Sequence, residues 1–122
     1  MALRYVLDEH LRGPLWDAVL RHNATGVDPL DVTRVGDPVD LPLGAPDPDI
    51  LIWAEWEGRI LVGLDKSTMA THLADHLASG HTSPGVFTLR RRFSLPALVN
   101  FLVLAAYATD PTEWQDQISF VP

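Results

Sequence analysis

Length, composition and charge already exclude several classes of protein. The chain has 122 residues, of which 47% are hydrophobic and 20% charged, and this globular balance excludes an intrinsically disordered protein. The net charge of −7 excludes a broad basic surface for nucleic acid, but it leaves open a nuclease whose carboxylates hold metal ions. The length predicts a single domain over residues 1–122.

The cysteine content and the apolar runs indicate the cellular compartment in which the protein is expected. Cysteine is absent, which excludes disulfides and thiolate metal sites and favours a cytoplasmic protein. The longest apolar run, from Ala97 to Ala108, is interrupted by Asn100 and is too short to cross a bilayer. No membrane association is therefore expected.

The first half of the chain predicts strands that alternate with helices. Residues 3–7 form a short apolar run that predicts a buried strand, and apolar residues at helical spacing predict a helix over 11–22. Residues 31–36 are rich in β-branched side chains and predict a second strand. The proline-rich segment 36–49 then predicts a loop.

The second half continues the alternation. A helix is expected from Asp47, as its cap, to about Glu57, with Pro48 in its first turn and Gly58 at its end. The remaining expected elements are a strand over 59–64, a helix over 68–78, a strand over 86–89, a helix over 96–108 capped by Ser94, and a last short strand in 117–122. This order predicts an α/β fold in three layers, α/β/α, with a central, mainly parallel sheet.

Acidic residues follow two of the predicted strands. Asp8 and Glu9 come after the first strand, Asp65 ends the third, and Asp49 opens the helix that leads into it. Ligands of such sheets bind beyond the carboxyl ends of the strands. Hard cations such as Mg²⁺ or Mn²⁺ bind carboxylates there and activate water for phosphodiester cleavage. We therefore expect Asp8, Asp49 and Asp65 to be metal ligands and catalytic residues, while Glu9 either assists as a ligand or points to solvent.

The same carboxylates also have simpler interpretations. Asp8 and Asp65 are each suited to capping the helix that follows, and Asp49 is suited to the positive end of its helix dipole. The segment Arg90–Arg92 has two interpretations, a solvated turn or a phosphate-binding segment. In an extended segment Arg90 and Arg92 point the same way, so these two are the expected substrate contacts.

Three stretches of the chain resemble a known family. The segments "YVLDEHL", "APDPDILIWAEWEGRILVGLDKSTM" and "PGVFTLR" are similar, in order, to the compact bacterial branch of PIN-like domains. The resemblance implies a metal-dependent ribonuclease with an α/β/α fold, in many cases the toxin of a toxin–antitoxin pair, and it suggests a homodimer. It also implies that Asp8, Asp49 and Asp65 form the acidic site, with RNA as substrate and an antitoxin protein as partner.

Other interpretations stay open beside the ribonuclease. Gly63, Ser67 and Thr68 stand where the family commonly has a threonine or serine, an aspartate and a phenylalanine. These differences favour a degenerate PIN-like domain acting as a binding or interaction module. A phosphoacceptor receiver domain also has paired acids after its first strand, but it needs a lysine after its last strands, and the only lysine is Lys66. His72 and His76, four residues apart, suit a zinc site on one helix face or simply a polar face.

Overall fold

The computed structural model describes residues 2–122, and strands alternate with helices throughout. In chain order the elements are β1 (Arg4–Leu7), the 3-10 helix η1 (Glu9–Leu11), α1 (Pro14–Ala24), β2 (Asp31–Arg34), α2 (Asp47–Glu57), β3 (Ile60–Leu64), α3 (Met69–Ala78), β4 (Val86–Leu89), α4 (Leu95–Ala108), the 3-10 helix η2 (Pro111–Glu113) and β5 (Ile118–Val121). These bounds agree with the predicted elements to within a few residues.

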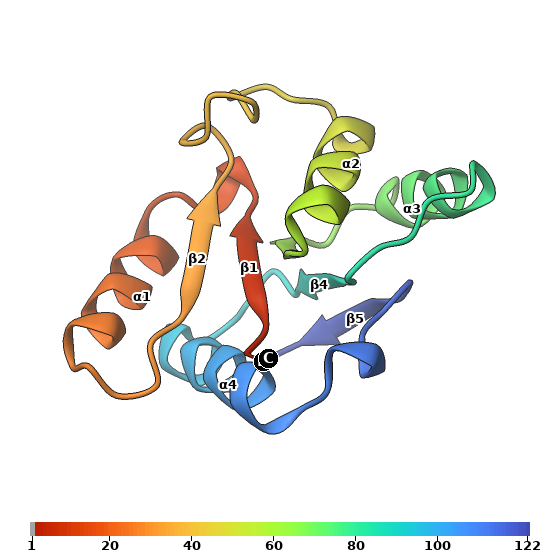
Figure 1. Cartoon of the computed structure of the whole chain (residues 1–122). Coiled ribbons are helices and arrows are strands. Elements are labelled where there is room, and N and C mark those ends of the chain that lie inside the picture. Colours follow the sequence, from red (N-terminus) through yellow and green to blue (C-terminus); the bar gives the residue numbers. More distant parts are fainter. Residues whose placement is uncertain (1) are drawn as a thin grey trace.

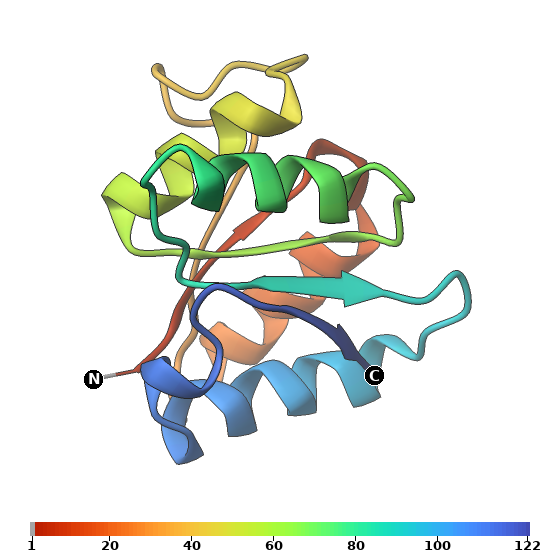
Figure 2. The ribbon, with the colours of Figure 1, turned by 90° about the vertical axis from the view of Figure 1, so that its right-hand side faces the viewer.

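The five strands form one sheet in the order β2-β1-β3-β4-β5, and all neighbouring pairs are parallel. Helices α1 and α4 pack together on one face, while α2 and α3 pack on the other, and Figure 2 shows the sheet between these two layers. The predicted three-layer α/β/α fold is therefore confirmed. Because all strands run the same way, their carboxyl ends lie at one edge, and Figure 1 shows β1 and β2 pointing towards the loop 36–46.

Alternation along the strands produces two separate cores. Tyr5 and Leu7 point towards α1 and α4, whereas Val6 between them points towards α2 and α3. Nearly every strand residue of β1, β3 and β4 is buried, as expected for a parallel sheet covered on both sides. The Tyr5 hydroxyl donates a hydrogen bond to the carbonyl of Leu102, which ties α4 to the central strand.

The last crossover has a different hand from the other three. From β1 to β2 the chain moves towards one edge of the sheet, and α1 lies on the first face. From β2 through β3 to β4 the chain moves towards the opposite edge, and α2 and α3 lie on the second face. The step from β4 to β5 continues in that second direction, but α4 lies beside α1. About 98% of such crossovers share one hand, so this connection is exceptional. In this position α4 covers Phe87 and Leu89, which point to its face.

Within residues 2–122, no helix has both the length and the apolar character that a membrane span requires.

Candidate functional site

Asp8 is the most deeply placed carboxylate at the carboxyl edge of the sheet. It follows β1, a central strand, and only 4% of its surface is exposed. Its backbone N–H donates to the carbonyl of Val62 on the neighbouring strand β3, which fixes the point where the chain leaves the sheet. Its side chain stands at the start of η1 but makes no capping hydrogen bond, so capping does not explain it. A buried carboxylate of this kind needs a cationic partner.

Lys66 supplies that partner. Its Nζ lies 3.0 Å from Oδ2 of Asp8 and 3.5 Å from Oδ1 of Asp47, so one ammonium group joins two carboxylates from different elements. Partial burial acts to lower the pKa of Lys66, but the hydrogen bond and charge of Asp8, with a contribution from Asp47, outweigh burial and raise it. This place at the sheet edge therefore attracts positive charge.

Asp47, which the sequence suggested as a helix cap, is the carboxylate that accompanies Asp8. Pro46 occupies the cap position of α2 and no side chain caps that end, so the expected capping role of Asp47 is wrong. Asp49 is exposed and lines a different cleft, together with Asp40, Trp53 and Trp56. Residues two positions apart on a helix are separated by about 200° around its axis, so the carboxylates of Asp47 and Asp49 face in different directions.

The helix pattern held a signal for Asp47. Asp47 precedes the buried residues Ile50 and Leu51 by three and four positions, which places it on the buried stripe of α2. A cap assignment considers only the first turn of the helix. The positions of the buried residues along the whole helix decide which carboxylate faces the sheet edge.

The other predicted acidic residues are more exposed. Asp65 follows β3 and is exposed, although its backbone N–H donates to the carbonyl of Leu89 on β4. Glu9 is half-buried, and its Oε1 accepts a hydrogen bond from the backbone N–H of Gly44, so it anchors the loop 36–46. Across residues 2–122, the ligand atoms of Asp8, Asp49 and Asp65 do not all come within 4.8 Å of one another. These three carboxylates were expected to lie close together, and their side chains do not. Their binding of metal stays a prediction.

Gly63 leaves the space beside Asp8 unfilled by a side chain. A Cβ at this position would stand 3.4 Å from Oδ2 of Asp8, an ordinary contact distance. Gly63, one of the positions at which the sequence differs from the usual PIN-like pattern, therefore lies directly against the buried carboxylate of Asp8.

A second acidic residue at this edge, Asp37, is already neutralised. It forms ion pairs with Arg34 at 2.6 Å and with Arg12 at 3.1 Å. Slight burial acts to raise the pKa of Asp37, but its hydrogen bonds to both arginines lower it on balance. These contacts hold the turn after β2 and leave Asp37 a structural residue.

Arg90 and Arg92 line one cleft after β4, together with Phe120 of β5. The guanidinium of Arg90 lies 5.7 Å from the centre of the Phe120 ring. Both arginines are exposed, as a phosphate-binding segment requires. Their shared cleft agrees with the expected common direction, while phosphate binding itself stays a prediction.

A different group of polar side chains lies between α2, α3 and the loop that leads into β4. Oε1 of Glu55 is 3.0 Å from Nε2 of His76 and 3.0 Å from Nδ1 of His81, and the three ligand atoms all lie within 4.8 Å of one another. The two imidazole rings stack with their centres 4.7 Å apart. His76 therefore meets His81 in this cluster, and His72, which the sequence paired with His76, stands outside it.

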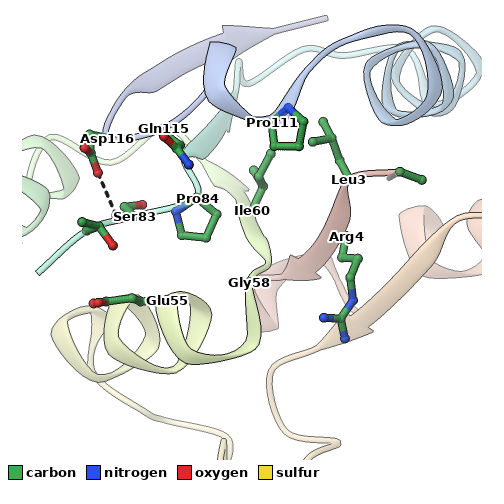
Figure 3. A pocket seen from close by; sticks show the side chains of 12 residues that line it. Leu3, Arg4, Glu55, Gly58, Ile60, Ser83, Pro84, Pro111, Gln115 and Asp116 are labelled. Carbon is green, nitrogen blue, oxygen red and sulfur yellow. Dashed lines mark hydrogen bonds between the residues drawn. The ribbon is translucent and has the colours of Figure 1, made fainter.

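Glu55 also borders a cleft of about 460 Å³ at the amino ends of the strands. Figure 3 shows Glu55 on α2 at the margin of this cleft, opposite the chain segment that carries Ser83 and Pro84. The backbone N–H of Ser83 donates to Oδ1 of Asp116 at 2.8 Å, which fixes the loop before β4. No local sequence pattern marks this site, because Glu55 lies on α2 while the two histidines lie at the end of α3 and in the loop that follows it.

No family model, curated protein or solved structure matches this chain.

Proposed function

We propose that this protein is a metal-dependent ribonuclease of the PIN-like type, with its acidic site around Asp8. The observation that carries the proposal is the buried carboxylate of Asp8 at the carboxyl end of a central parallel strand. This edge of an α/β sheet is where ligands bind. The resemblance of the surrounding segments to PIN-like domains supports the assignment.

The donor set suits a hard divalent cation. Asp8 and Asp47 present carboxylate oxygens, which are the ligands that Mg²⁺ and Mn²⁺ prefer. Both carboxylates already contact the ammonium group of Lys66, so their combined field holds positive charge. Asp8 and Asp47 would hold the ion, with Asp65 as the further ligand that the sequence predicts at this edge. Asp49 faces a different cleft, and Glu9 anchors the adjacent loop.

The bound ion would activate water and stabilise the leaving oxygen in phosphodiester cleavage. Asp8 is buried, so it provides a fixed charge in a poorly hydrated place. Lys66 is able to move from the carboxylates to a substrate phosphate, because its flexible side chain is 28% exposed. Arg90 and Arg92 would bind neighbouring phosphates of the RNA.

The test combines binding with activity. Calorimetric titration with Mn²⁺ is expected to show binding by the wild type and loss of that binding in the double variant Asp8→Asn/Asp65→Asn. Cleavage of a mixed set of RNA oligonucleotides should require Mn²⁺ or Mg²⁺ and should disappear in the same variant. Metal-independent cleavage, or full activity in the folded variant, contradicts the proposal.

The second candidate is a degenerate PIN-like domain that acts as a binding or interaction module. The observation in its favour is Lys66, whose ammonium group already neutralises the two carboxylates. The same titration separates the two functions. Absence of Mn²⁺ binding at millimolar concentration, with RNA present, favours the module, and pull-down of a protein partner would then be the next experiment.

A PIN-like ribonuclease would act in the cytoplasm, either alone or as a homodimer, and in a toxin–antitoxin pair it would be restrained by an antitoxin. If a small gene lies beside this one, coexpression with it tests this part of the proposal. Relief of growth inhibition by the neighbour supports the toxin assignment, whereas growth that is unaffected by the nuclease alone opposes it.

A further inference from the structure

We infer that Glu55, His76 and His81 form a second metal site, selective for a Zn²⁺-class transition-metal ion. The site lies between α2, α3 and the loop before β4, and none of its residues belongs to the proposed nuclease site. Two imidazole nitrogens and one carboxylate oxygen are a common set of three protein ligands for Zn²⁺.

The spacing of the three ligand atoms suits a common ion. With metal–ligand bonds of about 2.0–2.1 Å, two ligand atoms on one tetrahedral ion stand about 3.3 Å apart. The two distances from Oε1 of Glu55, to Nε2 of His76 and to Nδ1 of His81, are each 3.0 Å. The side chains are therefore gathered at nearly the separation that an ion between them requires.

The directions of these contacts are the stronger observation. Oε1 of Glu55 is buried and has no hydrogen-bond partner, although two imidazole nitrogens lie 3.0 Å away. An imidazole N–H and an imidazole lone pair point along the same line from the nitrogen. Since neither nitrogen is aligned for a hydrogen bond to Oε1, neither lone pair is aimed at it. A buried carboxylate oxygen without a hydrogen bond is costly, and a shared ion removes that cost.

His76 is buried beside Glu55, but its Nε2 is engaged by a carbonyl group that an ion would have to replace. Only 6% of its surface is exposed, and its Nε2 lies 2.8 Å from the carbonyl oxygen of Thr82. A carbonyl only accepts, so Nε2 carries a proton in that arrangement. Binding of an ion at Nε2 would require the ring to turn away from Thr82 and the proton to pass to Nδ1, so that the imidazole stays neutral and Nε2 presents a lone pair. Glu55 and His81 each border a cleft, so an ion would reach the site from solvent.

The ligand types separate this site from the carboxylates around Asp8. Imidazole nitrogen suits Zn²⁺ and other borderline cations, whereas carboxylates alone suit Mg²⁺ and Mn²⁺. An ion here would join α2 to the end of α3 and to the loop that follows α3. Because it binds only the folded chain, it should raise the thermal midpoint of unfolding.

The test is titration of chelator-treated protein with Zn²⁺ by calorimetry, with Co²⁺ as a spectroscopic probe of tetrahedral coordination. Glu55→Gln and His81→Ala are each expected to lower the affinity for Zn²⁺ by about 100-fold, since both remove a direct ligand. These two residues are more exposed than His76, so their variants should fold. In Asp8→Asn, which lacks the central carboxylate of the proposed nuclease site, Mg²⁺ should leave the thermal midpoint of unfolding unchanged.

Two matched controls make the result specific. His72→Ala removes a histidine from the same helix and the same cleft, and Asp8→Asn alters only the carboxyl edge. Both controls should keep wild-type affinity for Zn²⁺ to within about twofold. The inference is overturned by a wild type that binds no Zn²⁺ at 100 µM, by equal losses in all variants, or by a loss in His72→Ala that exceeds the loss in His81→Ala.

Discussion

The two edges of the sheet present opposite solutions to burying charge. At the carboxyl edge Asp8 is paired with Lys66, a cation that the chain itself provides. At the edge near the amino ends of the strands, Oε1 of Glu55 is buried against His76 and His81 without an aligned hydrogen bond. The first arrangement is satisfied before any ion binds, whereas the second lacks a partner that an ion would supply.

This difference indicates what each edge does on binding metal. An ion at Asp8 must compete with Lys66, so binding there is weakened unless substrate phosphate draws the lysine away. An ion at Glu55 replaces the hydrogen bond between Nε2 of His76 and Thr82, and it gives the unsatisfied Oε1 of Glu55 a partner. We therefore expect weak, substrate-assisted binding of Mn²⁺ at one edge and tighter, substrate-independent binding of Zn²⁺ at the other.

The largest expected effect is on catalysis. Asp8→Asn should lower RNA cleavage by on the order of 1,000-fold, because it removes the central charge that holds the ion. Glu55→Gln should leave cleavage within about twofold of the wild type, because it alters only the other edge. Steady-state rates at saturating Mn²⁺, with folding checked by circular dichroism, measure both. A comparable loss of cleavage in Glu55→Gln would contradict the expectation that the two sites act independently.

The next effect is on stability at the amino ends of the strands. Gly85 has φ +124°, and a Cβ there would stand 2.5 Å from the carbonyl oxygen of Trp114. Gly85→Ala should therefore lower the free energy of unfolding by about 3 kcal/mol, and it should also weaken Zn²⁺ binding because the loop bearing His81 shifts. The measurement is urea denaturation, followed by Zn²⁺ titration.

Gly80→Ala is the matched control for that experiment. Gly80 also has a positive φ, of +89°, but a Cβ there meets nothing within 4 Å. Its substitution should lower the free energy of unfolding by only about 1 kcal/mol. Equal losses in the two variants would show that backbone conformation alone, without the contact to Trp114, limits this loop.

A smaller effect is expected on removing Lys66. Lys66→Met leaves the buried carboxylate of Asp8 without its cation and should lower the free energy of unfolding by about 1–2 kcal/mol, because Lys66 is partly exposed. The same variant should bind Mn²⁺ about 10-fold more tightly than the wild type if the ammonium group and the ion compete for one place. Calorimetry decides, and unchanged or weaker Mn²⁺ binding would place the ion away from Lys66.

The smallest effect is a dependence of stability on alkaline pH. The pKa of Lys66 is raised in the folded state, so its stabilising contribution is complete below the ordinary value of 10.5 and is lost as pH rises through the higher folded value. The difference in urea midpoint between the wild type and Lys66→Met should therefore shrink above pH 10.5. Tyr5, whose pKa burial also raises, is present in both proteins and cancels in this difference. A constant difference from pH 8 to pH 12 would contradict the ion pair.

Most of the fold was predictable because local patterns agree with the tertiary structure. The helix over 47–57 carries Pro48 in its first turn and ends at Gly58, whose φ of +66° suits glycine. Ser94 caps α4 as predicted and accepts from the N–H of Ala97. The hand of the last crossover was not predictable, because no local signal states which face of the sheet a mostly apolar helix will cover.

The sites were less predictable than the fold. Asp8 is identified by its position after a buried strand, but its contact with Lys66 depends on a side chain that turns back from the end of β3. Glu55, His76 and His81 come from two helices and a loop, and only His76 belonged to a recognisable spacing. Sequence spacing finds ligands that share one element, and it misses sites that form only when elements pack.

The return of α4 to the face of α1 has a consequence for folding during synthesis. The core between α2, α3 and the sheet is built mostly from residues that precede the end of β4, so it can form early as the chain leaves the ribosome. The core beneath α1 needs Leu98 and Leu102 and stays open until α4 has emerged. We expect α1 to remain loosely held on the nascent chain, and its docking to mark the final step by which the domain closes.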